Sequence, residues 1–332
     1  MKQVTKKIFA AICSATMLAG AAFAPSLGIF KNSEIVASAY SNYINGCHWE
    51  YELDMGGYAI TKCRNYQHLQ SVNVPTTING QPVVAIYDNA FINNSESCAQ
   101  YIVNITLPNT IYKIGKNFFR NCDKLQSITL PSALITIGDY SFYDADGLQN
   151  ITFPNKVKQI GSYVCNWAYG LQNVTLGSQL EMIGEGAFAR TPKLQNFNSS
   201  SSSMLKFISK DILVNSKWAN DRANNDALYI GYNNRVLLRY QRGGTNQTVS
   251  LGSNVRILAD RAFNTAGWAG SGQYIRDIYC PRIEYIGSSV FGMTPSARVH
   301  LSGSLMFTHY GSNYATSVPP IVAPATAYFD LP

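Results

Sequence analysis

Histidines are the only side chains in this chain that ordinarily titrate near neutral pH, and there are four of them. None of the four, His48, His68, His300 and His309, lies beside a nucleophile in the spacing of a GxSxG or HExxH motif. An enzyme would need the fold to join His48 or His68 to a carboxylate from elsewhere in the sequence. Because no local spacing supports that arrangement, we predict that the protein is not an enzyme and uses no cofactor.

Cysteine is the second residue type with reactive chemistry, and six of the seven cysteines follow residue 39: Cys47, Cys63, Cys98, Cys122, Cys165 and Cys280. Six thiols permit fifteen complete pairings, and sequence alone does not choose among them. Cys47 and Cys63 are the best disulfide candidates, because WEYELDMGGYAIT between them is typical of a hairpin that turns at Asp54-Met55-Gly56 and brings the flanking cysteines opposite one another. Metal binding is the alternative, but no CxxC or HxxxH spacing favours it, so we predict no metal site.

A short acidic motif, Asp144-Ala-Asp146-Gly147, resembles the opening of a calcium-binding loop. The other ligands of such a loop and its closing glutamate are missing. The same place one interval earlier in the chain reads Asn121-Cys-Asp123. We therefore interpret the motif as a polar turn.

All these residues are set in a repeat with a step of 23 residues, marked by Ile-Gly pairs that begin at Ile114, Ile137, Ile160 and Ile183. Three further columns keep the same step: Leu125, Leu148, Leu171 and Leu194; Pro108, Pro131 and Pro154, with Gly177 in the fourth place; and Phe119, Phe142 and Phe188, with Cys165 in the third place. A fixed period with apolar residues at set offsets is the signature of a solenoid, in which each coil buries its apolar face against its neighbours.

Within one unit the residue types predict a strand followed by a turn. The alternation places Ile128 and Leu130 inward and the intervening polar residues outward, and Pro131 ends the strand because it offers no backbone donor. The glycine of each Ile-Gly pair is expected to adopt a backbone conformation that a side chain would hinder, and the phenylalanine column is expected to fill the coil interior. Stacked coils would pair like strands in parallel, about 4.8 Å apart.

Outward strand positions form polar columns, which predict a ligand-binding face. The candidate residues are Asn104, Thr106, Gln126, Ser127, Thr129, Gln149, Asn150, Thr152, Gln172, Asn173 and Thr175. A solenoid often binds its partner through such a surface. The alternative is structural, because threonine favours strands and stacked amides can hydrogen-bond along a parallel ladder.

Tryptophans and tyrosines offer a second kind of binding surface, since their rings can stack on sugars. Trp167 lies in a connection between coils, Trp218 lies in a segment expected to be a short helix, and Trp268 lies farther along the chain. A glycan-binding module would gather exposed aromatic residues on one face. A purely structural spacer would show no ligand-like patch.

Weaker copies of the repeat extend the array on both sides, with Ile86 and Phe91 upstream and Leu258 and Phe263 downstream, where Ala259 takes the place of the glycine. A last copy supplies Ile286, Gly287 and Phe291. We predict a capping hairpin at 40–70, repeats at 71–198, an insertion at 199–248, further repeats at 249–301 and a tail or cap at 302–332. The serine run at 199–203 is expected to be a flexible loop.

Residues 1–39 predict a secretory signal peptide, since three lysines precede an apolar run and Ala37-Ser-Ala39 fits a cleavage site. An uncleaved membrane anchor is the alternative, although the run is short for one. The formal net charge of the whole chain is +7, and cleavage after Ala39 would leave about +4 without any basic run interleaved with aromatic residues. We therefore predict a secreted or cell-surface protein that binds no nucleic acid and has no membrane span in its mature chain.

The pattern Leu-x-x-Ile-x-Leu-Pro followed by Ile-Gly-x-x-(Ala/Ser)-Phe resembles the BspA-type leucine-rich repeat of bacterial secreted and cell-surface proteins, over roughly residues 71–301. The segment DILVNSKWANDRANNDALYIGYNNRVLLRYQ, which starts at Asp211, is similar to an insertion of that family, a short helix and then a hairpin. The resemblance implies a β-rich solenoid, a right-handed coil with a parallel β-sheet on one face and short turns or helices on the other. It also implies adhesion to host matrix proteins or other cells, with an extracellular glycan as the alternative ligand.

Overall fold

A computed structural model describes residues 40–64, 70–93, 96–97, 101–222, 225–240, 247–263, 275–291, 298–302, 307–308 and 321–322. The chain divides into two compact units, Met1–Ser38 and Ala39–Pro332, and every described residue belongs to the second. The predicted signal peptide therefore lies outside the described residues.

The predicted hairpin at the amino-terminal end is present and has one strand more than expected. Strand β2 (Cys47–Asp54) turns through Met55 and Gly56 into β3 (Gly57–Arg64), and β1 (Tyr40–Ile44) adds to the other edge of β2, all antiparallel. Strand β3 then pairs in parallel with β6 (Gln81–Ile86), which begins the coils. The hairpin thus covers the open end of the repeat array, as a capping element must.

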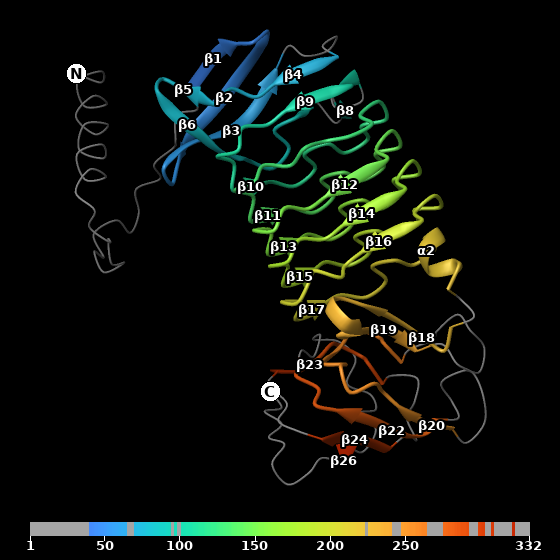
Figure 1. Cartoon of the computed structure of the whole chain (residues 1–332). Coiled ribbons are helices and arrows are strands. Elements are labelled where there is room, and N and C mark those ends of the chain that lie inside the picture. Colours follow the sequence, from blue (N-terminus) through green and yellow to red (C-terminus); the bar gives the residue numbers. More distant parts are fainter. Residues whose placement is uncertain are drawn as a thin grey trace, which may run out of the picture. The chain divides into compact units, whose positions relative to one another are not determined.

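Like strands of successive coils pair in parallel on one side of the repeat (Figure 1). This ladder carries the isoleucines of the Ile-Gly pairs, and Ile114, Ile137 and Ile160 are register partners in turn. After β6 it continues through β10 (Lys113–Ile114), β11 (Thr136–Ile137), β13 (Gln159–Ile160), β15 (Met182–Ile183) and β17 (Phe207–Ile208), and β5 (Thr77–Ile78) pairs with β6 at its start.

A second parallel ladder follows the leucine column, and its outward side chains are the predicted ligand face. Its strands are β12 (Asn150–Thr152), β14 (Asn173–Thr175) and β16 (Asn196–Asn198), with a single bridge from Ser127 to Asn150. Upstream, β4 (Ser71–Asn73) pairs in the same way with β9 (Asn104–Thr106). A separate antiparallel pair joins β7 (Ile92–Asn93) and β8 (Glu96–Ser97). The exact coils therefore carry ladder residues on two sides, although the coil that holds β11 contributes only the Ser127 bridge to the outward ladder.

The insertion has the predicted helix and hairpin, and the coils resume after it. Helix α2 (Lys217–Asn220) precedes β18 (Ala227–Ile230), the short helix η2 (Tyr232–Asn234) and β19 (Val236–Tyr240). Strand β19 heads a ladder with β21 (Ile257–Leu258), β23 (Tyr285–Ile286) and β25 (Phe307–Thr308). The outward ladder resumes as β20 (Gln247–Ser250), β22 (Ile275–Pro281), β24 (Arg298–Ser302) and β26 (Ile321–Val322).

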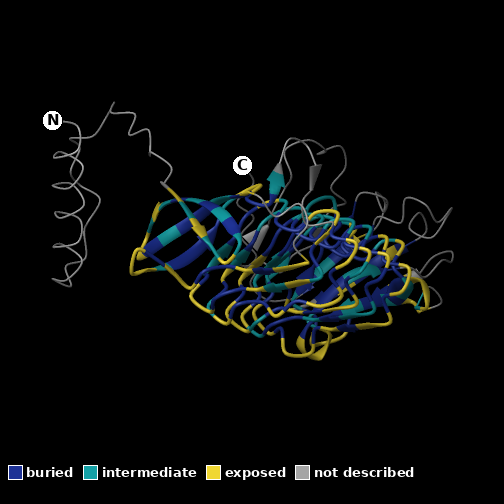
Figure 2. Cartoon of the chain, turned by 90° about the horizontal axis from the view of Figure 1, so that it is seen from above, coloured by how far each residue is buried: buried dark blue, intermediate teal, exposed yellow. Residues whose placement is uncertain are grey.

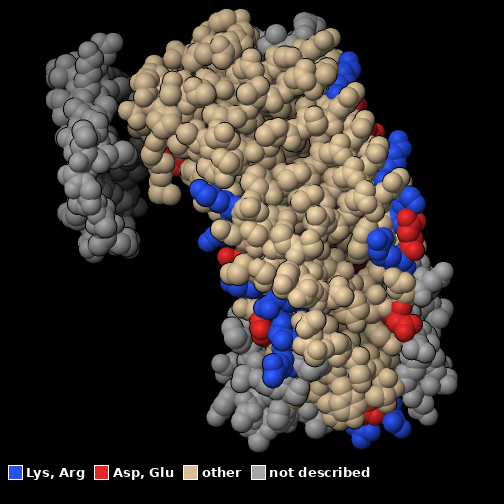
Figure 3. All heavy atoms as spheres, viewed as in Figure 1, with Lys and Arg blue, Asp and Glu red and all other residues tan. Residues whose placement is uncertain are grey.

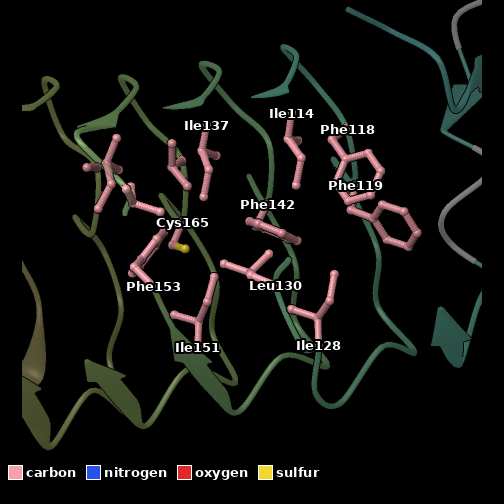
Figure 4. Close-up of a cluster of buried hydrophobic side chains, with 14 of the residues drawn as sticks. Ile114, Phe118, Phe119, Ile128, Leu130, Ile137, Phe142, Ile151, Phe153 and Cys165 are labelled. Atoms are coloured by element: carbon pink, nitrogen blue, oxygen red, sulfur yellow. The ribbon is translucent and has the colours of Figure 1, made fainter. Parts of the chain in front are cut away.

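The interior of the coils is filled as the repeat predicted. Ile128 and Leu130 are buried, and so are Phe119, Phe142 and Cys165 of the phenylalanine column (Figure 4). Seen from above, buried residues occupy the inside of the coils and exposed residues their periphery (Figure 2). Cys165 leaves room where its neighbours carry a ring, and Phe153, which directly follows β12 in the same coil, lies beside it (Figure 4).

The Ile-Gly glycines are required for a reason other than the predicted one. The backbone φ angle is not positive at Gly115, Gly138, Gly161 or Gly184. A Cβ on Gly138 would instead lie 2.6 Å from backbone atoms of Gly115 and Lys116 in the preceding coil. The column is therefore glycine because adjacent backbones approach too closely there to admit a side chain.

Positive φ is found at two other positions of each coil, three and seven residues after the isoleucine. The first position holds Asn89, Asn117, Tyr140, Tyr163, Gly186, Asp211, Arg261 and Ser289, and the second holds Asn121, Asp144, Trp167, Arg190 and Asn215. Asparagine and glycine tolerate this conformation, whereas aromatic residues adopt it rarely. The bulky residues at these turns therefore carry strain that the stacked coils impose.

The serine run is an ordered part of the structure, so the expectation of a flexible loop was wrong. Ser199 and Ser202 are buried, and the Oγ of Ser202 donates to the Gly177 carbonyl at 3.0 Å. The Oγ of Ser201 donates to the Leu176 carbonyl at 2.9 Å, and the Ser199 Oγ accepts from the Gly231 amide at 2.9 Å. These hydroxyls bind backbone groups that the interrupted ladder leaves without strand partners.

Candidate functional site: the outward strand face and its groove

All eleven predicted ligand-face residues lie on one side of the coils and are exposed or half-buried. Their register is exact from coil to coil, since Asn150 pairs with Asn173 and Thr152 with Thr175. The inward residues between them, Ile151 and Val174, are buried. The alternation read from the sequence therefore places these side chains on the surface of the sheet.

The asparagine column forms a hydrogen-bonded ladder, as its structural interpretation anticipated. The Nδ2 of Asn173 donates to the Oδ1 of Asn150 at 2.5 Å, and the Nδ2 of Asn196 donates to the Oδ1 of Asn173 at 2.7 Å. Asn104 makes a longer bond to the Oγ of Ser71, at 3.4 Å. These amides use part of their hydrogen-bonding capacity within the sheet, which reduces what they can offer to a ligand.

The glutamine column instead lines an open groove of about 460 Å³, which we call the glutamine groove. Its walls and ends are formed by Val103, Asp123, Lys124, Gln126, Asp146, Gly147, Gln149, Gly170, Gln172 and Lys193. Three predicted residues, Gln126, Gln149 and Gln172, are among the lining residues, while the threonine column does not contribute. The groove therefore combines neutral amides, two carboxylates and two ammonium groups on one surface.

The floor of the glutamine groove follows from a single column of the repeat. Lys124, Gly147, Gly170 and Lys193 occupy the same position of four successive coils. The two glycines leave the middle bare, and a Cβ on Gly170 would lie 2.0 Å from the Asp146 carbonyl oxygen of the preceding coil. Lysines therefore mark both ends of a stretch that has no side chains of its own.

Carboxylates crowd one side of this groove. Burial, together with the neighbouring charge of Asp146, raises the pKa of Asp123 and the pKa of Asp144 above their ordinary value. Asp144 adopts positive φ, and the Oδ1 of Asp146 accepts a hydrogen bond from the Tyr169 amide at 3.2 Å. These features are those of the polar turn that the sequence predicted for the acidic motif.

On the face seen in Figure 3, charged side chains gather along the margins, and the surface between the margins is largely free of them. Several charged side chains pair across coils, such as Lys116 with Asp139 at 3.1 Å and Lys210 with Glu185 at 3.2 Å. Exposed pairs of this kind contribute little to stability. Contact with a partner on the uncharged area would therefore require little desolvation of charge.

Aromatic residues form two small groups in the turns that lead into the outward strands. Tyr140 stacks on Tyr163, with ring centroids 5.2 Å apart. Trp167 meets Tyr169 edge to face at 5.6 Å, and Arg190 lies over the Trp167 ring at 4.7 Å. Trp218 is buried and packs against Phe197, while Trp268 lies outside the described residues.

The outward face of the later coils carries charges in the same columns, a group we call the Asp277 cluster: Arg276, Asp277, Arg298 and His300. The Asp277 side chain is 4% exposed and accepts bonds from Arg276 Nε at 2.8 Å and Arg298 Nε at 2.9 Å. His300 Nε2 lies 3.0 Å from Asp277 Oδ1, and the ring of His300 stacks on Tyr279. The hydrogen bond with His300 and the two guanidinium groups lower the pKa of Asp277 to about 2.

The two candidate disulfide cysteines lie side by side as thiols. Both are buried, and a hydrogen bond with the Cys63 side chain lowers the pKa of Cys47. The register places Cys63 opposite Trp49, two residues from the expected Cys47. The turn pairs Asp54 with Gly57, which alone would place Cys63 opposite His48, and the shift between Glu50 and Tyr51 adds one more residue. The disulfide itself stays a prediction.

The remaining candidate residues from the sequence, the histidines and Cys98, are located as follows. His48 lies half-buried in β2, whereas His68, His309 and Cys98 lie outside the described residues. Among the described residues no group of three or more His, Cys, Asp or Glu side chains is placed to hold a metal ion. None of the helices in the described part of the chain has the length and apolar character that crossing a bilayer requires.

Sequence reasoning missed part of this site. It named the glutamines but not Asp123, Lys124, Gly147, Gly170 or Lys193, although the column from Lys124 to Lys193 keeps the same step and was readable. It also missed the Asp277 cluster, because the register partners Asp277 and Arg298 are 21 residues apart and depart from the 23-residue step.

These features define a solenoid of leucine-rich repeats with a polar outward face, and sequence comparison agrees. Residues 84–218 match the family model of the BspA type leucine rich repeat region, in six copies. The chain therefore carries a BspA-type leucine-rich repeat region, as its motif indicated.

Solved structures with related architecture come from bacteria. The Treponema pallidum leucine-rich repeat protein TpLRR is 23% identical over 64% of this chain and 78% of its own, with a TM-score of 0.41. A leucine-rich repeat protein from Bacteroides ovatus is 19% identical over 79% of this chain and 71% of its own, with a TM-score of 0.43. The pneumococcal vaccine antigen PcpA is 16% identical over 79% and 70%, with a TM-score of 0.42. Comparison with curated protein sequences found no match.

Proposed function

We propose that this protein is exported by a bacterium and binds extracellular proteins noncovalently, and that it serves adhesion to host matrix or to other cells. The glutamine groove is the observation that carries the proposal. It places Gln126, Gln149 and Gln172 in adjacent coils, beside a floor without side chains. Amides in such a row can donate to and accept from a polypeptide backbone, which offers the same two groups in turn.

A rigid, preformed face supports this role. The positions of the groove residues are determined by backbone ladders. The backbone N–H of Gln149 donates to the backbone carbonyl of Gln126 at 3.0 Å, and the backbone N–H of Gln172 donates to the backbone carbonyl of Gln149 at 2.8 Å. Binding would therefore order few groups, and little conformational entropy would be lost. Avidity along several coils would supply affinity that no single contact provides.

Binding to an array that holds extracellular-matrix proteins and polysaccharides tests the proposal. A variant with Gln149→Arg and Gln172→Arg fills the groove with two long side chains. We expect saturable protein binding that falls at least tenfold in this variant, which is about 1.4 kcal/mol. The matched control is Gln159→Arg with Gln179→Arg, which adds the same charge at exposed positions outside the groove.

Circular dichroism must show that both variants remain folded. Protein binding that is unchanged by the groove variant, or lost equally in the control, would contradict the assignment of the groove. Silence across the whole array would favour a structural spacer.

Glycan binding is a second candidate function, favoured by the aromatic groups in the turns. Tyr169 is 40% exposed and occupies the same position of its coil as Asp123 and Asp146 do in the two preceding coils. An aromatic ring therefore lies next in the column that supplies the two carboxylates of the groove. Carboxylates and a stacking ring together suit a sugar. Polysaccharide binding that survives the arginine changes and is lost in Tyr169→Ala would support this candidate over the first.

A further inference from the structure

We propose that Cys47 and Cys63 form a disulfide in the exported protein, and that this bond fastens the capping hairpin over the first coil. The proposal is independent of the ligand that the outward face binds. It concerns strands β2 and β3, which seal the amino-terminal end of the core.

The hairpin covers this end of the core. Trp49 from β2 meets Phe91 of the first coil edge to face, with ring centroids 6.1 Å apart. The Cys63 amide donates to the Ala90 carbonyl at 2.7 Å, so the cysteine itself lies where the hairpin joins the coil. Separation of β2 from β3 would expose these buried rings to water.

The two thiols are placed to react with each other. Both side chains are fully buried on the same face of the hairpin, where Cys63 is the register partner of Trp49, two residues along β2 from Cys47. The Cα atoms of diagonal neighbours on paired antiparallel strands lie about 7–8 Å apart, so a small backbone movement brings them within the span of a disulfide. A hydrogen bond with the Cys63 side chain lowers the pKa of Cys47, which makes Cys47 the attacking group.

The other described cysteines lack such a partner in reach. Cys122 and Cys165 belong to coils two steps apart, which corresponds to about 9.6 Å along the stack. Cys280 lies in the core of the later coils, and burial raises the pKa of its thiol to about 12. We therefore expect oxidation to select one pair.

The chemistry is thiol–disulfide exchange with an external disulfide as the oxidant. The Cys47 thiolate attacks one sulfur of the donor, the donor S–S bond breaks, and its other half leaves as a thiolate. The Cys63 thiol then loses its proton and attacks the mixed disulfide at the Cys47 sulfur, releasing the second half of the donor. The two cysteines lose two electrons and two protons, and the donor disulfide is reduced to two thiols.

The test uses the full chain, purified in reduced form, unfolded in denaturant and refolded in a buffer that contains reduced and oxidised glutathione, so that the oxidant reaches both thiols before the hairpin buries them. Remaining thiols are then alkylated under denaturing conditions, and peptides are mapped by mass spectrometry with and without reduction. We expect a Cys47 peptide joined to a Cys63 peptide that separates on reduction, and alkylated Cys122, Cys165 and Cys280. Alkylation of both hairpin cysteines, or a bond from Cys63 to any other cysteine, would overturn the proposal.

Stability gives a second readout that does not depend on making a variant. Oxidised protein should melt roughly 5–10 °C above the same protein held in reductant, because the bond constrains a loop of about sixteen residues in the unfolded chain. The variant with Cys47→Ser and Cys63→Ser should melt like the reduced protein and respond to neither reagent. Equal melting of the oxidised and reduced protein would show that the bond does not fasten the cap.

Discussion

The same columns of the repeat carry neutral amides and hydroxyls in the earlier coils and charges in the later ones. Asn150, Asn173 and Asn196 bond to one another along β12, β14 and β16. In β22 and β24 the corresponding register pair is Asp277 with Arg298. The inward residues between these positions are apolar in both regions and are buried. Packing therefore dictates the inward face of a coil and leaves the outward face open to different chemistry.

Carboxylates in the two regions respond to their surroundings in opposite directions. Beside the glutamine groove, burial and the charge of Asp146 raise the pKa of Asp123. In the Asp277 cluster, His300 and two arginines lower the pKa of Asp277. The ionised form of Asp123 is disfavoured by its surroundings, and a positively charged ligand group could stabilise it. The charge of Asp277 is already balanced by its neighbours.

Coil stacking should give the largest effect. The change Gly138→Ala puts a Cβ 2.6 Å from the backbone of the preceding coil and should lower the free energy of unfolding by about 3 kcal/mol or more. In the later region Gly252→Ala is the control, because no described atom lies within 4 Å of its Cβ, and the expected change is within about 0.5 kcal/mol. Urea denaturation measures both. Equal effects would mean that the glycine column is not set by backbone approach.

The Asp277 cluster should give the next largest effect, and its pH dependence identifies it. Asp277→Asn should destabilise the protein at pH 7, because two guanidinium groups lose the carboxylate that binds them. A carboxyl whose folded pKa is depressed contributes stability above its unfolded pKa of about 3.9, and this is lost as pH falls through about 2.

The difference between wild type and Asp277→Asn should therefore shrink between pH 4 and pH 2, as followed by denaturation midpoints. Asp221→Asn, which breaks the exposed pair with Lys217 at 2.8 Å, serves as the control with little expected effect. A penalty for Asp277→Asn that persists unchanged at pH 2 would show that shape and not charge is responsible.

Sequence was sufficient for the elements that obey the period. The coil register and the buried isoleucine and phenylalanine columns follow from the spacing, and the capping hairpin follows from residue type. The helix with its hairpin was implied by the resemblance to the repeat family. Sequence identified the glycine column but gave it the wrong reason, because close approach of two backbones is a property of the stack and not of one unit. The turn positions with positive φ were missed. Asparagine occupies them in some coils, but Tyr140 and Trp167 occupy them in others, so no consistent residue type marks them.

The candidate site was predictable where the repeat shows a polar column. Gln126, Gln149 and Gln172 were found because the 23-residue step repeats glutamine directly before the outward strand positions. The lining residues from the turns were missed, since no alternation rule says which turn side chains lean over a neighbouring coil. The serine run was misjudged because composition suggested disorder, while its hydroxyls bind carbonyl groups of Leu176 and Gly177 that the sequence does not reveal as lacking partners.

The smallest expected effect concerns the repulsion between Asp146 and the neighbouring carboxylates beside the glutamine groove. Asp146→Asn removes the charge that disfavours ionisation of Asp123 and Asp144, so the pKa of both carboxyls should fall toward the ordinary value. Part of each shift should remain, because burial is its largest cause. Side-chain carbonyl chemical shifts followed by NMR across an acid titration measure each group directly.

The sign of the stability change follows from the same shifts. A carboxyl whose folded pKa is raised stabilises the fold below its unfolded pKa and loses that contribution as pH rises through the folded pKa. Asp146→Asn should therefore raise stability slightly at pH 7 and leave it unchanged in acid, where Asp123 and Asp144 are protonated. If the pKa of Asp123 did not move in this variant, the two carboxylates would not sense each other across the coils, and the acidic wall of the groove would have no shared charge to offer a ligand.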